Sequence, residues 1–341
     1  MAFFPIELEG EPYGIGYKRG WLFRYHIRSI AETRLSKIPE KEEKIQLAKY
    51  IEKVLKDNYP ELVEELRGMA DGSGIGYEEM LLINAWWDKP WWCSNVALTE
   101  TSLGPILGSS LDIGYPPDVT MMHYKPKQGY SFVTVGQVDL IGSARAMNEK
   151  GLCVGGSSVK ATDTGKGFPR YTLLRVAIQY CATVDEVLEL FKRFREGLYN
   201  PGNYIFLDRN GDAVVIEQTN TGFTVRRPEK GGIACTNHYE SPEAQKYQYT
   251  GYDWLWVIRN SEERYRNFMD FIKTADRSKP IESMMMVIRS HGPGGICQHG
   301  GEHQLCATVG FIMLPGQREF HVSQPPGFYC KSKFIKYTVF E

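Results

Sequence analysis

The sequence lacks an excess of charge of either sign. Its 341 residues hold 40 Lys and Arg against 41 Asp and Glu, a formal net charge of −1, and no basic run reaches five residues. Nucleic acids and anionic membrane surfaces attract proteins through clustered positive charge. We therefore expect neither a nucleic acid nor a membrane as a partner.

Long apolar segments are missing as well. No uninterrupted apolar run approaches the ~20 residues that a membrane-spanning helix requires. The first residues contain no basic segment and include an acid at Glu7, a pattern that is not typical of a signal peptide. We expect a cytoplasmic protein.

Cysteine is sparse and unevenly placed. The chain holds an odd number of cysteines, at positions 93, 153, 181, 235, 297, 306 and 330. This scatter does not indicate a disulfide framework in a chain of this length, so reduced thiols are expected.

The glycines at 14, 16 and 20 and at 72, 74 and 76 do not follow strands as a dinucleotide-binding fingerprint would, and we interpret them as turn and cap glycines. We expect no cofactor.

The composition is that of an ordinary globular protein, with 42% hydrophobic and 24% charged residues. The first 92 residues are mainly helical in pattern, whereas strands dominate from residue 93 onward. Helices are predicted at Trp21–Ile30, Glu40–Leu55, from Pro60 to the glycines at 72–76, Tyr77–Trp87, Tyr171–Cys181, Val184–Phe194, Glu262–Thr274 and Ile281–Ser290. Strands are predicted at Phe3–Leu8, Val96–Leu98, Pro105–Leu107, Tyr130–Val135, Leu140–Ala146, Leu152–Ser158, Tyr204–Leu207, Ala213–Glu217, Phe223–Arg226, Thr308–Leu314, Glu319–Val322 and Ile335–Phe340. Strands and helices in this order predict an α+β domain in which stacked sheets are covered by helices on both outer faces.

One hairpin carries the residues with the clearest chemistry. Cys93 begins an apolar, β-prone run, and a second run after a Gly-Pro turn ends in a lone acid, Asp112. If the chain is cut before Cys93, that residue supplies both a thiol, with pKa near ~8.5, and an α-amine, with pKa near ~8. This pairing of nucleophile and base is the principle of the N-terminal-nucleophile (Ntn) hydrolases. A buried cysteine that only fills space is the alternative.

Several motifs resemble the acyl-coenzyme A:6-aminopenicillanic acid acyltransferase family (peptidase family C45), and more distantly the choloylglycine hydrolases and penicillin V acylases. The resemblance runs nearly end to end and depends on the order of its parts. The matching segments are Gly10–Gly20, Glu64–Gly74, Leu82–Ala85, Cys93-Ser94, Met147–Leu152, Asp208–Gly211, Ile216-Glu217, Thr236–His238, Ser290-His291, Ile296–His299 and Thr308–Gly310.

The resemblance implies a four-layer αββα sandwich, the Ntn-hydrolase fold, with a helical N-terminal pro-segment. It also implies self-cleavage that leaves a small chain, residues 1–92, and a large catalytic chain, residues 93–341. Asp112 stands where the family has its conserved acid and would orient the new α-amine, although a turn-capping role is the alternative.

Two further residues are carried over from the family pattern. Asn237 would donate to the oxyanion of the tetrahedral intermediate. Arg264 would lower the pKa of the thiol or bind a substrate carboxylate. Arg266 competes with Arg264 for this assignment, since both lie in the same charged helix.

The chain departs from the family around the thiol. Ser109 and Ser110 stand where an Arg or Gln and then an Asn are usual, and Ser158 stands in place of a second oxyanion Asn. Trp92 occupies the position before the scissile bond, where a small residue is common. We expect Trp92, Ser109 and Ser158 to shape the substrate site. The aromatic run Trp86–Trp92 either plugs this site before cleavage or packs the small chain onto the large one.

A final cluster of His291, Cys297, His299, His303 and Cys306 contains residue types that bind zinc. The spacing fits no common zinc module, so we expect no metal.

Taken together, these residues predict a self-processing cysteine amidohydrolase or acyltransferase acting on a linear amide, with its own segment 1–92 and a small-molecule amide or acyl donor as partners. A choloylglycine hydrolase-like or penicillin V acylase-like activity on N-acyl amides is one alternative, and an unprocessed, inactive relative that only binds acyl ligands is another. A homo-oligomer is left open.

Overall fold

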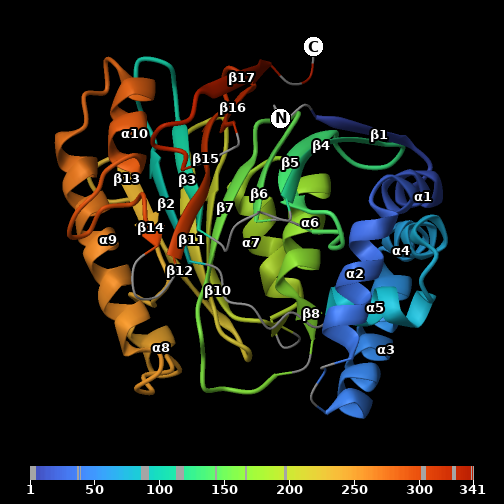
Figure 1. Cartoon of the computed structure of the whole chain (residues 1–341). Coiled ribbons are helices and arrows are strands. Elements are labelled where there is room, and N and C mark those ends of the chain that lie inside the picture. Colours follow the sequence, from blue (N-terminus) through green and yellow to red (C-terminus); the bar gives the residue numbers. More distant parts are fainter. Residues whose placement is uncertain are drawn as a thin grey trace.

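The computed structural model describes residues 5–36, 38, 40–85, 92–112, 119–142, 144–165, 167–195, 198–300, 305–324, 328–338 and 340. Figure 1 shows stacked layers, with two sheets lying face to face between helices. Sheet A has the strand order β1-β4-β5-β6-β7-β10-β11-β12. Sheet B has the order β13-β2-β3-β15-β16-β17, and β14 pairs with β15. The predicted αββα sandwich is therefore confirmed.

The strands of sheet A are β1 (Ile6–Gly10), β4 (Val119–Pro126), β5 (Phe132–Gln137), β6 (Arg145–Asn148), β7 (Cys153–Ser158), β10 (Gly202–Leu207), β11 (Ala213–Gln218) and β12 (Phe223–Arg226). Those of sheet B are β2 (Trp92–Leu98), β3 (Ile106–Asp112), β13 (Gly232–Cys235), β14 (His299–Gly300), β15 (Leu305–Leu314), β16 (Glu319–Ser323) and β17 (Phe334–Thr338). A small separate pair is formed by β8 (Phe168–Pro169) and β9 (Leu198–Tyr199).

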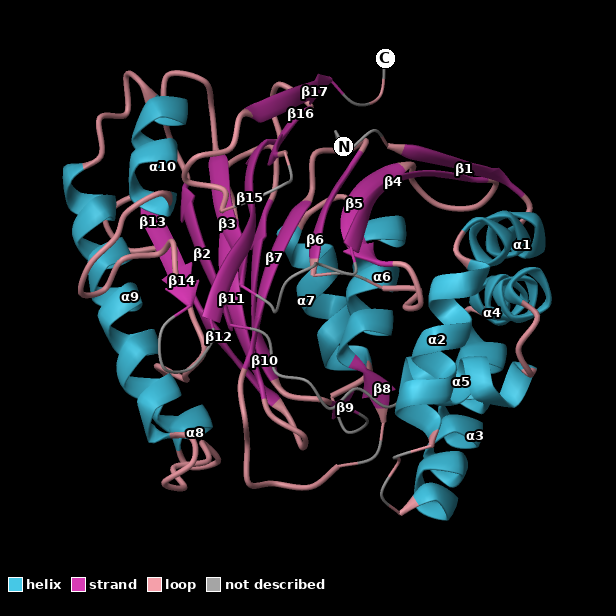
Figure 2. Ribbon diagram, in the orientation of Figure 1, coloured by secondary structure: helices cyan, strands magenta, loops and turns pink. Residues whose placement is uncertain are grey.

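Helices cover both outer faces, as the ribbon in Figure 2 makes clear. Sheet B is covered by α9 (Leu255–Thr274) and α10 (Pro280–Ile288), and the short helix α8 (Pro242–Gln245) contacts β12 of sheet A. Sheet A is covered by α6 (Arg170–Tyr180) and α7 (Val184–Arg193). The N-terminal helices form a group beyond them: α1 (Pro12–Leu22), α2 (Arg24–Leu35), α3 (Lys41–Asn58), α4 (Pro60–Ser73) and α5 (Tyr77–Ala85).

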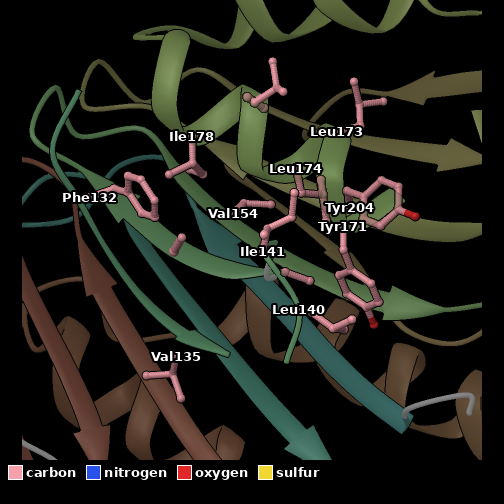
Figure 3. Close-up of a cluster of buried hydrophobic side chains, with 14 of the residues drawn as sticks. Phe132, Val135, Leu140, Ile141, Val154, Tyr171, Leu173, Leu174, Ile178 and Tyr204 are labelled. Atoms are coloured by element: carbon pink, nitrogen blue, oxygen red, sulfur yellow. The ribbon is translucent and has the colours of Figure 1, made fainter. Parts of the chain in front are cut away.

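The largest core spans sheet A and the layers on either side of it. Figure 3 shows its α6 side, where Leu174 and Ile178 of the helix lie close to Val154 of β7, with Phe132 of β5 next to Ile178. A second core fills the space between the other face of sheet B and helices α9 and α10. Among the described residues, no helix has the length and apolarity to cross a membrane.

Strand β2 contributes to both cores because its side chains alternate between faces. Cys93 and Ala97 belong to the core shared with sheet A, whereas Val96 and Leu98 belong to the core under α9 and α10. Strands β2 and β3 are antiparallel, and Trp92 is paired with Asp112. The thiol of Cys93 therefore points between the sheets, while the side chain of Asp112 leaves on the helix-covered face.

The glycines of α1 and α4 correct one sequence interpretation. Of the glycines interpreted as turn and cap residues, Gly14, Gly16 and Gly20 lie inside α1 and Gly72 lies inside α4, whereas Gly74 caps the end of α4 with a φ of 72°. Gly16, Gly20 and Gly72, together with Gly68 of α4, lie where the two helices meet. A methyl group at Gly16 would lie 2.0 Å from the Glu65 carbonyl oxygen. These glycines allow the two helix backbones to touch, which a turn interpretation based on local propensity misses.

Candidate active site

The backbone of Cys93 is held on both sides by side chains from distant parts of the chain. Its N–H donates to Oδ1 of Asn237 at 3.1 Å. Its carbonyl oxygen accepts from Nη1 of Arg264 at 3.1 Å and from Oγ of Ser157 at 3.0 Å. The residue is almost fully buried at the start of β2. The N–H of the peptide before the thiol and the carbonyl of the peptide after it are thus both held by side chains.

Arg264 is the centre of this arrangement. It projects from α9, is fully buried, and also donates to Oγ of Ser94 at 2.7 Å and to Oδ1 of Asn237 at 3.0 Å. Its Nε donates to Oδ1 of Asn260 one turn earlier, at 2.8 Å. Arg266 instead lies on the surface near Glu262, at 3.7 Å. The structure therefore places Arg264, and not its competitor, beside Cys93.

Asn237 follows β13 and is oriented by its hydrogen bonds. Its backbone N–H donates to Oγ of Ser261 at 2.6 Å, and its Nδ2 donates to the Ser158 carbonyl at 2.8 Å. Because Oδ1 accepts from two N–H groups, the amide can lie only this way round. In this uncleaved chain the amide oxygen of Asn237 accepts from the Cys93 backbone. Its role as an oxyanion donor stays a prediction.

Asp112 is fully buried beside these residues. Its Oδ2 accepts a hydrogen bond from Oγ of Ser110 at 3.2 Å. Burial raises the pKa of its carboxyl to about 7, although the charges of Arg264 and Arg145 and the Ser110 hydrogen bond act in the opposite direction. A group with this pKa exchanges its proton near neutral pH.

The thiol of Cys93 lies in an environment with opposing effects. Burial and the negative charge of Asp112 raise its pKa, while the positive charges of Arg145 and Arg264 and a hydrogen bond from the Asp112 backbone lower it. Arg170 also interacts electrostatically with this thiol. The closed site therefore keeps the thiol protonated while placing cations where a thiolate would form.

A small cavity adjoins the thiol and leaves only about 10 Å³ for the centre of a water molecule. It is lined by Cys93, Ala144, Gly156, Ser157, Ser158, Arg170, Tyr171 and Tyr204. The sequence predicted Ser158 here, and its Oγ accepts from Nη2 of Arg170 at 2.9 Å. This cavity is too small for an acyl group.

The other two predicted substrate-site residues lie outside this cavity. Ser109 donates to Oδ1 of Asn95 at 2.7 Å, and Asn95 in turn donates to Ser157 at 2.8 Å. Trp92 stacks on Trp254 and Trp256 of the α9 end, with ring centroids 6.4 and 5.8 Å away. Residues 86–91 of the predicted aromatic run lie outside the described residues.

Sequence reasoning missed Ser157, Arg145 and Arg170. Ser157 donates to the Cys93 backbone and accepts from Asn95, and neither bond can be inferred from a serine in a strand. Arg145 could have been noticed, because a charged residue inside an apolar strand pattern requires a buried partner. It is buried, and its Nη2 donates to the Gly156 carbonyl at 2.8 Å. The run Gly155-Gly156-Ser157-Ser158 is the sequence feature that could have indicated the cavity wall, because small residues in a strand leave space beside it.

Comparison with known proteins adds family information to this geometry. Residues 108–290 match the family model described as acyl-coenzyme A:6-aminopenicillanic acid acyl-transferase. An uncharacterized protein of Archaeoglobus fulgidus is 27% identical, over 65% of this chain and 44% of its own length. Protein dcd1A of Dictyostelium discoideum is 26% identical, over 54% of this chain and 51% of its own length. The chain thus spans about half the length of the curated relatives it matches.

Solved structures provide a comparison of the fold. A variant of the conjugated bile acid hydrolase from Clostridium perfringens superimposes with a TM-score of 0.52 over 72% of this chain and 97% of that chain. The two sequences are 13% identical, so this likeness concerns the fold alone. It agrees with the four-layer arrangement of Figure 1.

Proposed function

Because the chain belongs to the acyl-coenzyme A:6-aminopenicillanic acid acyl-transferase family and has the Ntn-hydrolase fold, we propose that it cleaves itself before Cys93 and then acts on linear, non-peptide amides. The observation that carries this proposal is the set of side-chain hydrogen bonds to the Cys93 backbone. Asn237 accepts from the N–H that cleavage would convert into an α-amine, while Arg264 and Ser157 donate to the carbonyl of Cys93 itself, on the other side of its Cα atom. Any buried backbone needs such partners, but here side chains from three distant segments supply them at the proposed cleavage point instead of a neighbouring strand.

In the proposed cleavage, the Cys93 sulfur attacks the carbonyl carbon of Trp92 and a thioester replaces the peptide bond. The proton lost by the thiol passes to the Cys93 nitrogen, which leaves as a free amine. Water then hydrolyses the thioester, which regenerates the thiol and leaves a carboxylate on Trp92. The cations Arg145 and Arg264 favour this step, since they lower the pKa of the attacking thiol.

The mature site would repeat the same chemistry on a substrate. The Cys93 α-amine takes the thiol proton, the sulfur attacks the amide carbonyl, and the protonated amine of the substrate leaves. The resulting acyl-cysteine is discharged to water or to an acceptor amine. Asn237 would turn from the backbone to the developing oxyanion, and Asp112 would orient the α-amine. Trp92, Ser109 and Ser158 would define the acyl group that fits.

Intact mass of the purified protein tests the proposal. We expect two fragments that break between Trp92 and Cys93, and a single uncut chain for Cys93→Ala. Cys153→Ala, a buried cysteine in β7, is the matched control and should be cut like the parent. After incubation with a panel of N-acyl amides, the peptide that begins at Cys93 should carry the acyl mass, and added amine should accelerate its loss if transfer operates.

A pair of arginine variants tests the geometry. Arg264 donates to four acceptors, the Cys93 carbonyl, Ser94, Asn237 and Asn260, whereas the ammonium of Arg264→Lys has three donors. Cleavage should therefore slow at least about tenfold, as expected when a charged hydrogen bond is lost. Arg266 lies two residues later in α9, on its exposed face, so Arg266→Lys should leave the rate of cleavage unchanged. A stable uncut chain that binds N-acyl amides with or without Cys93 would instead favour the inactive acyl-binding relative.

A further inference from the structure

Four side chains that bind soft metals converge at one point on the C-terminal half. They are His291, which follows α10, Cys297 and His299 around the start of β14, and Cys330, which lies between β16 and β17. Their ligating atoms all lie within 4.8 Å of one another. Cys330 joins the group from 31 residues beyond His299, which explains why spacing along the sequence did not reveal it.

The separations match a tetrahedral metal site. Nε2 of His299 lies 3.1 Å from Nε2 of His291, 3.3 Å from Sγ of Cys297 and 3.2 Å from Sγ of Cys330. A zinc ion with bonds of about 2.0–2.1 Å to nitrogen and about 2.3 Å to sulfur holds its ligand atoms about 3.3–3.8 Å apart. Small movements would therefore accommodate an ion.

Hydrogen bonding alone does not account for this convergence. One ring nitrogen of a neutral histidine offers a single donor or a single acceptor, yet Nε2 of His299 has three polar neighbours. Two thiolates and two neutral imidazoles also balance the charge of a divalent cation. The exposed edges at His291 and His299 would let the ion enter, while Cys297 is buried.

We propose that these four residues bind one zinc ion as a closed structural site. Four protein ligands leave no open position, so the ion would not activate water or substrate. On binding, it displaces the protons of the two thiols. This inference does not depend on the proposed amide chemistry, and it runs against the expectation from sequence spacing that the chain holds no metal. The candidate ligands His303 and Cys306 belong to the part whose side chains are not described.

The position of the site suggests what it would hold together. The ring of Tyr329, next to Cys330, packs against Gly310 of β15, and Gly310 is paired with Ser110 of β3. Ser110 donates to Asp112. Zinc would thus tie the end of α10 to the segment that covers the strand pair carrying Asp112.

Metal analysis of the full-length protein, purified without chelators, tests the proposal. We expect about one zinc per chain, and less than about a tenth of that in Cys297→Ser and Cys330→Ser. Cys181→Ser, at the end of α6, should retain the metal. His291→Cys, which keeps four ligands, should retain it too, and this outcome separates loss of a ligand from loss of the fold.

Cobalt supplies a spectroscopic readout. Protein freed of metal and loaded with Co²⁺ should show the strong visible bands of tetrahedral cobalt and a sulfur-to-metal charge-transfer band, both absent from Cys330→Ser. Zinc should raise the Tm of the metal-free parent and not that of this variant. A parent without zinc whose non-reduced mass is two hydrogens low would overturn the proposal in favour of a Cys297–Cys330 disulfide, and zinc retained by every variant would overturn it as well.

Discussion

At the residue scale, the buried carboxyl of Asp112 couples the stability of the uncleaved chain to pH. Its ordinary pKa of 3.8 rises to about 7 in the folded state, mainly through burial. Between these values the folded state binds more protons than the unfolded state, so the free energy of unfolding falls as pH rises from about 4 to about 7. Arg145, Arg264 and Ser110 limit the loss.

Asp112→Asn should remove this pH dependence. In a Cys93→Ala background, which keeps the chain uncut, the variant should gain stability relative to its parent across this window, by up to roughly 4 kcal/mol at 1.36 kcal/mol per pKa unit. Urea unfolding at several pH values measures the difference. Asp276→Asn removes a surface carboxylate whose pKa is lowered by hydrogen bonds from Ser278, and should give a flat difference above about pH 5. A flat difference for Asp112→Asn would contradict the prediction.

The positions of the central site residues could be predicted, but only through the order of the family motifs. Cys93 lies more than a hundred residues before Asn237, and Arg264 lies later still, in α9. No local sequence pattern relates the three residues. The structure places them in direct contact. Arg170 and Ser157 could not be found in this way, because the packing of β7 against β2 and of α6 against β7 determines their contacts.

At the scale of the elements, α1 and α4 approach each other through glycines on both helices. A methyl group at Gly68 would lie 2.1 Å from the Tyr13 carbonyl oxygen and 2.7 Å from the Tyr17 nitrogen, both backbone atoms that cannot rotate away. Gly68→Ala should therefore force the helices apart and lower the free energy of unfolding by about 1–3 kcal/mol. Denaturant unfolding in the Cys93→Ala background checks the value.

Gly14→Ala is the matched control in α1. No atom lies within 4 Å of the added methyl group, so only helix propensity changes, and stability should stay level or rise by up to ~1 kcal/mol. Equal effects at Gly14 and Gly68 would show that close helix contact is not the reason for the glycines.

Most regular elements followed from periodicity. Helices α3, α4, α6 and α7 begin and end within three residues of their predicted limits. The misses have physical causes. Helix α1 carries three glycines that disfavour helix locally, and its packing on α4 overrides that tendency. Strand β13 is too short to show alternation and is defined by pairing with β2.

For the whole molecule, the described part of residues 1–92 packs closely against the rest of the fold. Glu65 of α4 forms a buried double hydrogen bond with Arg175 of α6, at 3.1 and 2.7 Å. Arg19 of α1 donates to the carbonyls of Gln137 and Val138, at 2.7 and 3.1 Å. Strand β1 lies parallel to β4 at the edge of sheet A.

The small chain should consequently remain bound after cleavage. Both fragments should elute together on a native sizing column and separate only in denaturant. Glu65→Gln leaves Arg175 without its buried countercharge, a change that costs about 3–5 kcal/mol, and should release the small fragment at lower urea. Elution of the small fragment alone from the parent protein under native conditions would refute the prediction.

The parallel pairing of β1 with β4 has a kinetic consequence. While the chain is continuous, docking of this edge strand is part of a unimolecular reaction whose rate does not depend on protein concentration. Once the bond before Cys93 is cut, the same strand arrives from another molecule, so refolding becomes second order and slows on dilution. A cleaved molecule that has been denatured would then recover poorly in dilute solution, whereas its uncut precursor would recover at any concentration.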